Sequence, residues 1–282
     1  MSAISNTVSE DNIRSSVLER LQKIQPLILK IGAQLCKMQD EDLSIHEKGS
    51  EIDLVTKADY FSEKQITEWI NSSYPLDSIL AEEGGRTIQK NGNEYLWLID
   101  PLDGTINYAH GLPLYAISIG LMHGNKMAGG TVYLPALKEL YLAVRGGGAT
   151  KNGNPIHVSK TEELARALVV TGFPYNRRKI LPALLSGIGS ILMHARGIRR
   201  TGSAALDLCW VAEGRFDALY ELNLNPWDTG AGALIAIEAG ATVTDLKNKP
   251  FSPEEKSIVA SNGKIHAELI EALQEMMKER LE

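Results

Sequence analysis

A change of sequence pattern in the middle of the chain limits the folds that the chain can adopt. Between residues 115 and 158, short runs of β-forming residues alternate with Gly, Asn and Pro turns at close spacing. This pattern predicts an antiparallel meander with strands at 117–122, 128–133 and 139–144. After about Leu164, strand and helix patterns alternate instead. We therefore expect layers of helix and sheet that close over one cleft, not separable modules.

Apolar periodicity predicts the elements on both sides of the meander. Before it come a helix at 17–38, which Pro26 would kink, and a helix at about 58–71, joined by a polar link around residues 46–49. Strands at 79–81 and 94–99 follow. After the meander we expect strands at 168–171, 198–200, 216–220, 243 and 258–259, and helices at 181–193, 203–212, 228–239 and 266–280. We expect a single catalytic domain of two fused lobes, at about 1–160 and 161–282.

Charge and composition exclude several classes of protein. The formal net charge of −6 offers no basic excess, so a general nucleic-acid interface is not expected. Residues 1–14 are polar and no apolar run approaches the roughly 18 residues needed to span a bilayer. Cys36 and Cys209 lack CxxC spacing and lie in apolar surroundings, which indicates buried free thiols. We expect a cytoplasmic protein without a membrane partner.

The strongest chemical signal is the segment that runs from Asp100 to Thr105. An apolar strand delivers Asp100 and Asp103 three residues apart, and Pro101 and Gly104 shape the turn between and after them. Hard divalent cations prefer oxygen ligands, and the Leu102 carbonyl adds a backbone oxygen to the two carboxylates. A plain Asx-type turn is the alternative interpretation.

Four further acidic residues strengthen the metal interpretation when they are taken together. Glu82 and Glu83 follow a short apolar strand, and Asp59 and Asp228 stand at predicted helix starts, where capping alone would also explain an aspartate. Sites in α/β folds gather at strand ends and strand-to-helix junctions. The six histidines form no HxxxH pair, and no serine lies in a GxSxG setting. A carboxylate set of this kind favours Mg²⁺ over zinc.

These residues also carry a family resemblance. Segments 82–83, 100–108 and 226–232 resemble the signatures of the inositol monophosphatase family, and segments 48–49, 53–59, 172–174 and 201–205 support them. The resemblance runs in order from about Lys48 to Ala260. It implies the α-β-α-β-α sandwich of the inositol monophosphatase and fructose-1,6-bisphosphatase type, found in Mg²⁺-dependent, lithium-sensitive sugar phosphatases. Such proteins are usually homodimers.

The resemblance also implies roles for individual residues. One Mg²⁺ would be held by Glu82, Asp100 and the Leu102 carbonyl. A second would be held by Asp100, Asp103 and Asp228, and a third ion would lie near Glu82. Thr105 and Asp59, with Glu82 at the metals, would be the catalytic residues that activate a water for direct attack on phosphorus. The substrate-binding residues would be Gly104, Thr105, Ser203, Ala204 and Glu221.

The substrate itself leaves alternatives open. Residues 103–113 resemble the inositol branch of the family, which predicts hydrolysis of inositol 1-phosphate to inositol and phosphate. Fructose 1,6-bisphosphate, histidinol phosphate, adenosine 3′,5′-bisphosphate and NADP are rival substrates, and a non-catalytic regulatory binding protein is a different class. Many family members carry His where this chain has Asn225. Lys48 and the basic pairs 177–178 and 199–200 could meet a phosphate or simply lie on the surface.

Overall fold

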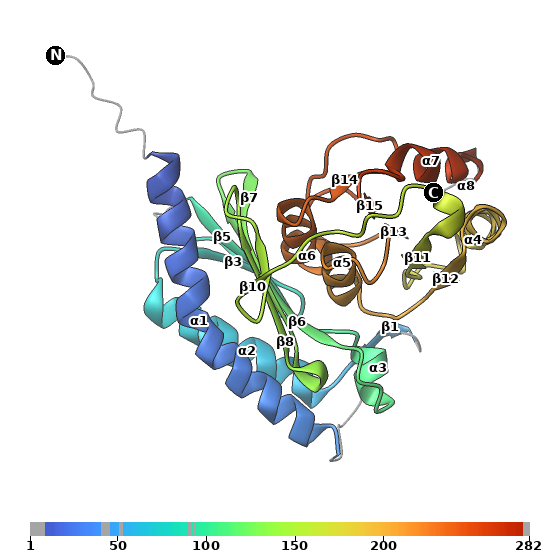
Figure 1. The fold of residues 1–282 in the computed structure, drawn as a ribbon. Coiled ribbons are helices and arrows are strands. Elements are labelled where there is room, and N and C mark those ends of the chain that lie inside the picture. The colour runs from blue at the N-terminus through green and yellow to red at the C-terminus, as the bar shows by residue number, and fades with distance from the viewer. Residues whose placement is uncertain (1–8, 41–45, 51–52, 90–91, 93, 279–282) are drawn as a thin grey trace.

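The computed structural model stacks helices and sheets in five layers (Figure 1). It describes the chain except for residues 1–8, 41–45, 51–52, 90–91, 93 and 279–282. Two long helices cover one face of an eight-stranded sheet, two helices lie between that sheet and a five-stranded sheet, and three helices cover the far face. The expected α-β-α-β-α sandwich is therefore confirmed.

The first layer consists of α1 (Glu10–Met38) and α2 (Lys57–Ser73). Ser9 caps α1 by accepting the amide of Asn12, and Thr56 caps α2 in a capping box with Asp59. The apolar stripes of both helices are buried against the sheet. The cap of α2 matters for function, because it fixes the side chain of Asp59 in the interior.

The eight-stranded sheet carries the edge on which the site is built. Its order is β10-β9-β8-β7-β6-β5-β3-β4, and every neighbouring pair is antiparallel except β3 and β5. In chain order the strands are β3 (Ser78–Ala81), β4 (Gly85–Thr87), β5 (Tyr95–Asp103), β6 (Ala116–His123), β7 (Lys126–Leu134), β8 (Glu139–Val144), β9 (Ala149–Lys151) and β10 (Asn154–Pro155). The short helix α3 (Thr105–Ala109) follows β5 directly.

The middle layer consists of α5 (Ala204–Ala212) and α6 (Pro226–Glu238). Both are rich in small residues, and a Cβ built on Gly130 of β7 would lie only 2.8 Å from the Cα of Ala231 in α6. This close approach lets α6 lie on the large sheet while its other side faces the C-terminal layers. The start of α6 is thereby brought to the same edge as the end of β5.

The five-stranded sheet has the order β12-β11-β13-β15-β14. Its strands are β11 (Leu168–Thr171), β12 (Gly197–Arg199), β13 (Ala218–Leu222), β14 (Thr242–Thr244) and β15 (Ser257–Ser261). The strands β11, β12 and β13 run parallel, and β15 is antiparallel to both of its neighbours. The outer helices α4 (Leu181–His194), α7 (His266–Ala272) and α8 (Gln274–Lys278) bury a third apolar core against this sheet.

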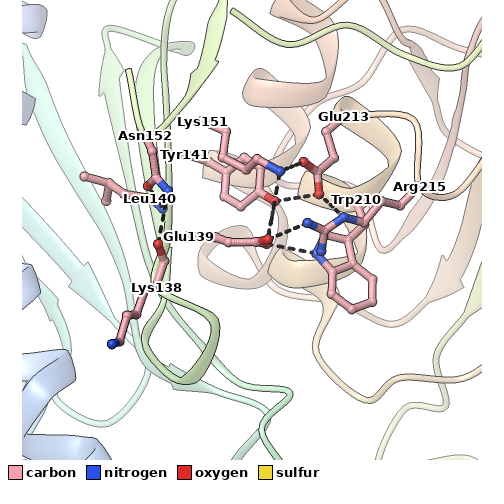
Figure 2. A network of polar contacts seen from close by, with 9 residues as sticks. All are labelled: Lys138, Glu139, Leu140, Tyr141, Lys151, Asn152, Trp210, Glu213 and Arg215. Carbon is pink, nitrogen blue, oxygen red and sulfur yellow. Dashed lines mark hydrogen bonds and ion pairs between the residues drawn. The ribbon is translucent and has the colours of Figure 1, made fainter. Parts of the chain in front are cut away.

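A polar network ties the meander to the end of α5 (Figure 2). The hydroxyl of Tyr141 lies 2.9 Å from Glu139 Oε2 and 2.8 Å from Glu213 Oε1. Lys151 and Arg215 form ion pairs with both glutamates. Because each partly buried carboxylate faces two cations and a phenol, the network is satisfied by its own members and connects the two sheets through α5.

The structure corrects several sequence expectations. The first helix begins at Glu10, not at residue 17, and the helix expected at 266–280 is split into α7 and α8 around Leu273. The expected polar link contains the strand β1 (His46–Ser50), which pairs with β2 (Asp53–Val55). Both cysteines are free, but Cys36 is only partly buried. In the described part of the chain, no helix is both long and apolar enough to cross a membrane.

Candidate active site

The site begins at the edge of the large sheet where β3 and β5 end together. These strands run parallel with Ala81 beside Ile99, so Glu82 and Asp100 leave the sheet at the same edge. The amide of Glu82 donates to the carbonyl of Ile99 at 3.1 Å, which continues the pairing by one residue. Both acids line a cavity of about 110 Å³.

An irregularity in the β5–β6 ladder brings the second aspartate to the same cavity. Asp100 pairs with Ser118 and Asp103 with Ala116, so three steps on β5 oppose two steps on β6. In a regular strand, residues three apart point to opposite faces, and one extra residue reverses that relation. Asp100 and Asp103 therefore both line the cavity, together with Leu102 between them.

Thr105 and Asp59 form a hydrogen-bonded pair beside the carboxylates that line the cavity. The hydroxyl of Thr105 lies 2.9 Å from Asp59 Oδ1 and 3.0 Å from the Leu102 carbonyl. Asp59 is fully buried, and its Oδ2 accepts the amide and the hydroxyl of Thr56 at 2.8 and 2.6 Å. Thr105 lines the cavity and Asp59 lies behind it. Gly104 reaches a φ of 93°, which glycine adopts without strain, and so allows α3 to start at Thr105.

Helix starts hold the side chains of Asp103 and Asp228 in place. Asp103 Oδ2 accepts the Ser203 hydroxyl and the Ala205 amide, both at 2.7 Å, at the beginning of α5. Asp228 is the third residue of α6, and its Oδ2 accepts the amide of Asn225 at 2.7 Å. Each aspartate thus takes part in a helix start and lines the cavity at the same time.

Burial and mutual repulsion act strongly on these acids. Burial, followed by the charges of Glu82, Asp103 and Asp228, raises the pKa of Asp100 well above its usual value. Burial also raises the pKa of Asp103 to about 6 and that of Asp228 to about 8. An excess of buried negative charge of this kind fits a site that receives a cation.

The donor set suits magnesium. Carboxylates and a backbone carbonyl are the hard oxygen ligands that Mg²⁺ prefers. Within the described residues, however, no three His, Cys, Asp or Glu side chains come together as a ready-made metal cluster. Mg²⁺ usually keeps several of its waters, so carboxylates that face one cavity without closing on one point still fit it.

The side of the cavity away from β5 is lined by groups from the C-terminal layers. Glu221 of β13 is 8% exposed, and its Oε2 has no hydrogen-bond partner in the described structure. Burial, then the charges of Asp103 and Asp228, raises the pKa of Glu221 to about 8, while Arg200 opposes the shift. Ala204 and Asn225 also line the cavity.

The structure separates the basic residues that the sequence left undecided. Arg177 and Arg200 line the cavity, whereas Arg178 and Arg199 do not. The side chain of Lys48 lies outside the described part of the structure.

Sequence reasoning missed several residues at the site. Tyr175 and Asn223 line the cavity without having been singled out. Glu63 of α2 is also buried, and its Oε2 accepts the amide of Glu83 at 2.9 Å, which supports the turn that carries Glu82. For Asn223 the sequence offered one usable signal, an asparagine two residues after Glu221, because asparagine favours left-handed turns; the structure gives this residue a φ of 56°.

Known proteins resemble this chain over most of its length. Residues 17–278 match the model of the inositol monophosphatase family. An inositol-1-monophosphatase from Synechocystis is 43% identical over 246 residues, which cover 87% of this chain and 85% of that protein. A fructose-1,6-bisphosphatase/inositol-1-monophosphatase from Aquifex aeolicus is 40% identical over 235 residues, covering 83% and 87% of the two chains.

A solved structure shows the same arrangement of layers. The extragenic suppressor protein suhB from Bartonella henselae superposes with a TM-score of 0.85 at 34% identity, covering 90% of this chain and 98% of that one. The family match, the sequence identity and the shared fold agree with the acidic cavity described above. The chain belongs to the inositol monophosphatase family.

Proposed function

We propose that the protein is a Mg²⁺-dependent phosphomonoesterase that hydrolyses inositol 1-phosphate and similar esters to the free alcohol and phosphate. The observation that carries the proposal is the meeting of five oxygen-donor residues and a hydroxyl–carboxylate pair at one cavity. The donors are Glu82, Asp100, Leu102, Asp103 and Asp228, and the pair is Thr105 with Asp59.

The acidic residues would divide between two metal positions. One Mg²⁺ would be held by Glu82, Asp100 and the Leu102 carbonyl. A second would be held by Asp100, Asp103 and Asp228, and a third ion would lie near Glu82. Bound Mg²⁺ would supply the positive charge that offsets the carboxylates, attracts the phosphate dianion and makes a nearby water more acidic.

Thr105 and Asp59 would orient the attacking water and receive its proton. The Thr105 hydroxyl can donate to Asp59 Oδ1 while its lone pair accepts a hydrogen bond from water. Burial raises the pKa of Asp59 against the hydrogen bonds from Thr56 and Thr105, which moves this carboxylate toward the range of a useful base. The water oxygen bonds to phosphorus, the phosphorus–alkoxide bond breaks, and the alkoxide takes up a proton.

The remaining cavity residues would hold the substrate. The backbone N–H groups of Gly104 and Thr105 would donate to phosphate oxygens, and Ala204, which lines the cavity, would contact the alcohol. The neighbouring Ser203 lies outside the cavity lining, where its hydroxyl donates to Asp103. Glu221 would accept hydrogen bonds from ring hydroxyls. Its buried and unpartnered Oε2 supports this role, because a buried acceptor without a donor is costly.

One observation favours a second substrate class. Arg177 and Arg200 line the same cavity as Glu221, and a sugar that carries a second phosphate would place that group within their reach. Fructose 1,6-bisphosphate is such a substrate, and the Aquifex relative carries both activities in its name.

Phosphate release from a substrate panel tests the proposal. The panel contains inositol 1-phosphate, fructose 1,6-bisphosphate, histidinol phosphate, adenosine 3′,5′-bisphosphate and NADP, each assayed with Mg²⁺, with EDTA and with Mg²⁺ plus Li⁺. We expect release from inositol 1-phosphate that EDTA abolishes and Li⁺ inhibits. Release in EDTA, or none from the whole panel, would refute a metal-dependent phosphatase of this class.

We further propose that the two lobes work as one catalytic domain and that the protein is a homodimer. The cavity takes residues from both sides of residue 160, which supports the single domain. Four large apolar side chains of α4 are exposed, Leu181, Leu185, Leu192 and Met193, and support a self-association surface. Light scattering behind a sizing column would give the mass in solution.

A further inference from the structure

Glu221 occupies its place only because the neighbouring strand end carries no side chain there. β11 and β13 run parallel with Thr171 beside Tyr220, so Gly172, the residue after β11, lies next to Glu221 of β13. A Cβ built on Gly172 would lie 1.8 Å from Glu221 Oε1, 2.2 Å from Cδ and 2.5 Å from Oε2. All three distances are far below any real carbon contact.

Space, not backbone conformation, is what this glycine provides. The φ of Gly172 is not positive, so another amino acid could adopt its backbone angles. The carboxylate of Glu221 fills the volume that a side chain at position 172 would take. This carboxylate also borders the cavity, and its buried Oε2 has no hydrogen-bond partner among the residues that the structure describes.

We infer that Gly172 is a specificity-determining position that admits the Glu221 carboxylate to the place where it accepts hydroxyl groups of the substrate alcohol. The inference rests on the proposed function, in which Glu221 receives those hydroxyls. Gly172 acts through Glu221 and is therefore a positioning residue.

The consequence of adding one methyl group follows from the distances. In Gly172→Ala, Glu221 Oε1 must move by about 1.6 Å before it reaches the 3.4 Å of an ordinary contact. The clashing atoms are the far end of a flexible side chain, so the carboxylate moves while the strands stay in place. A displacement of more than 1 Å removes hydrogen bonds that hold only between about 2.7 and 3.2 Å.

The test compares two substrates that differ in the alcohol. Inositol 1-phosphate presents ring hydroxyls and phenyl phosphate presents none, while both would offer the same phosphate to Thr105 and to the Mg²⁺ held by the carboxylates. Kinetic constants are measured for wild type, Gly172→Ala, Glu221→Ala and the double variant. Gly197→Ala is the matched control. Gly197 lies in β12, the strand next to β11, and the atom nearest to its added Cβ would be 3.6 Å away.

We expect Gly172→Ala to lower kcat/KM for inositol 1-phosphate by about 10- to 100-fold, mostly through KM, and to change phenyl phosphate turnover by less than about twofold. The kcat/KM of the double variant for inositol 1-phosphate should be no lower than that of Glu221→Ala, because both changes remove the same carboxylate from its place. Gly197→Ala should behave as wild type with both substrates.

Three results would overturn the inference. They are an unchanged kcat/KM for inositol 1-phosphate in Gly172→Ala, an equal loss with phenyl phosphate, or additive losses in the double variant. A wild-type protein that cleaves phenyl phosphate but not inositol 1-phosphate would instead refute the proposed function, and the inference with it.

Discussion

Replacing Thr105 by valine removes one hydroxyl from the centre of the site with almost no change in volume. That hydroxyl is 2.9 Å from Asp59 Oδ1 and 3.0 Å from the Leu102 carbonyl. Thr105→Val leaves Asp59 held by Thr56 alone. The water would then lose both its orienting group and its path for the proton.

The magnitudes follow from these contacts. A positioned group that takes part in proton transfer contributes typically 10²–10⁴-fold, so we expect kcat to fall by about 10²–10³. A buried hydrogen bond to a charged group is worth about 1.5–3 kcal/mol. For a chain of this size that corresponds to a loss of roughly 3–6 °C in Tm.

Phosphate release with saturating Mg²⁺ and thermal unfolding of the same samples measure the two effects separately. Thr105→Ser keeps the hydroxyl and should recover most of kcat. Thr131→Val is the matched control: Thr131 is fully buried in β7 and donates to the Tyr141 carbonyl at 2.9 Å, away from the cavity. It should lower Tm by about 2 °C and leave kcat unchanged.

The reasoning would be refuted if Thr105→Val kept more than about a third of wild-type kcat at saturating Mg²⁺. It would also be refuted if Thr131→Val lost as much activity as Thr105→Val, because the loss would then follow stability and not the hydroxyl at the site.

Three further predictions address other parts of the molecule. Asp228→Asn should lower kcat by at least about 10³-fold and weaken Mg²⁺ binding measured by calorimetry. Its Tm should change little, because the asparagine oxygen can still accept the amide of Asn225 at the helix start. Near-normal turnover would contradict the proposed metal role of Asp228. Tyr141→Phe should lower the free energy of unfolding in denaturant by about 1–2 kcal/mol with unchanged kcat, because it removes the hydroxyl that buried Tyr141 places between two partly buried glutamates. Burial lowers the pKa of His266, so its neutral form stabilises the fold fully above about pH 6.5 and less as the pH falls below that value. His266→Gln should therefore reduce the loss of Tm between pH 7.5 and pH 5. If the loss of Tm is unchanged, His266 is not a source of the pH dependence of stability.

The sequence was informative where local chemistry and position agree. The acids around Asp100 and Glu82 follow apolar strands, and strand ends are where layered folds collect sites. The reason that Asp100 and Asp103 face one cavity was not visible, because it depends on one extra residue in the pairing of β5 with β6. That register is a property of two strands and cannot be read from either alone.

Other boundaries were missed because tertiary packing sets them. The first turns of α1 are polar, so the apolar pattern begins only at Val17, although Ser9 supplies a cap. Around Leu273 the apolar pattern continues, and the structure nevertheless ends α7 there and buries Leu273 and Met276 in the outer core. Likewise, which arginine of each basic pair lines the cavity depends on the course of the loops.

The position of α6 has a consequence for how the chain is made. This helix, at residues 226–238, covers the inner face of a sheet whose strands end at Pro155. During synthesis, the large sheet therefore leaves the ribosome about 80 residues ahead of the helix that covers it, at roughly 5–20 residues per second. For several seconds a wide apolar face has no partner within its own chain, and Asp228 is not yet present. The nascent protein should consequently depend on chaperones in this interval and complete the acidic cavity only near the end of translation.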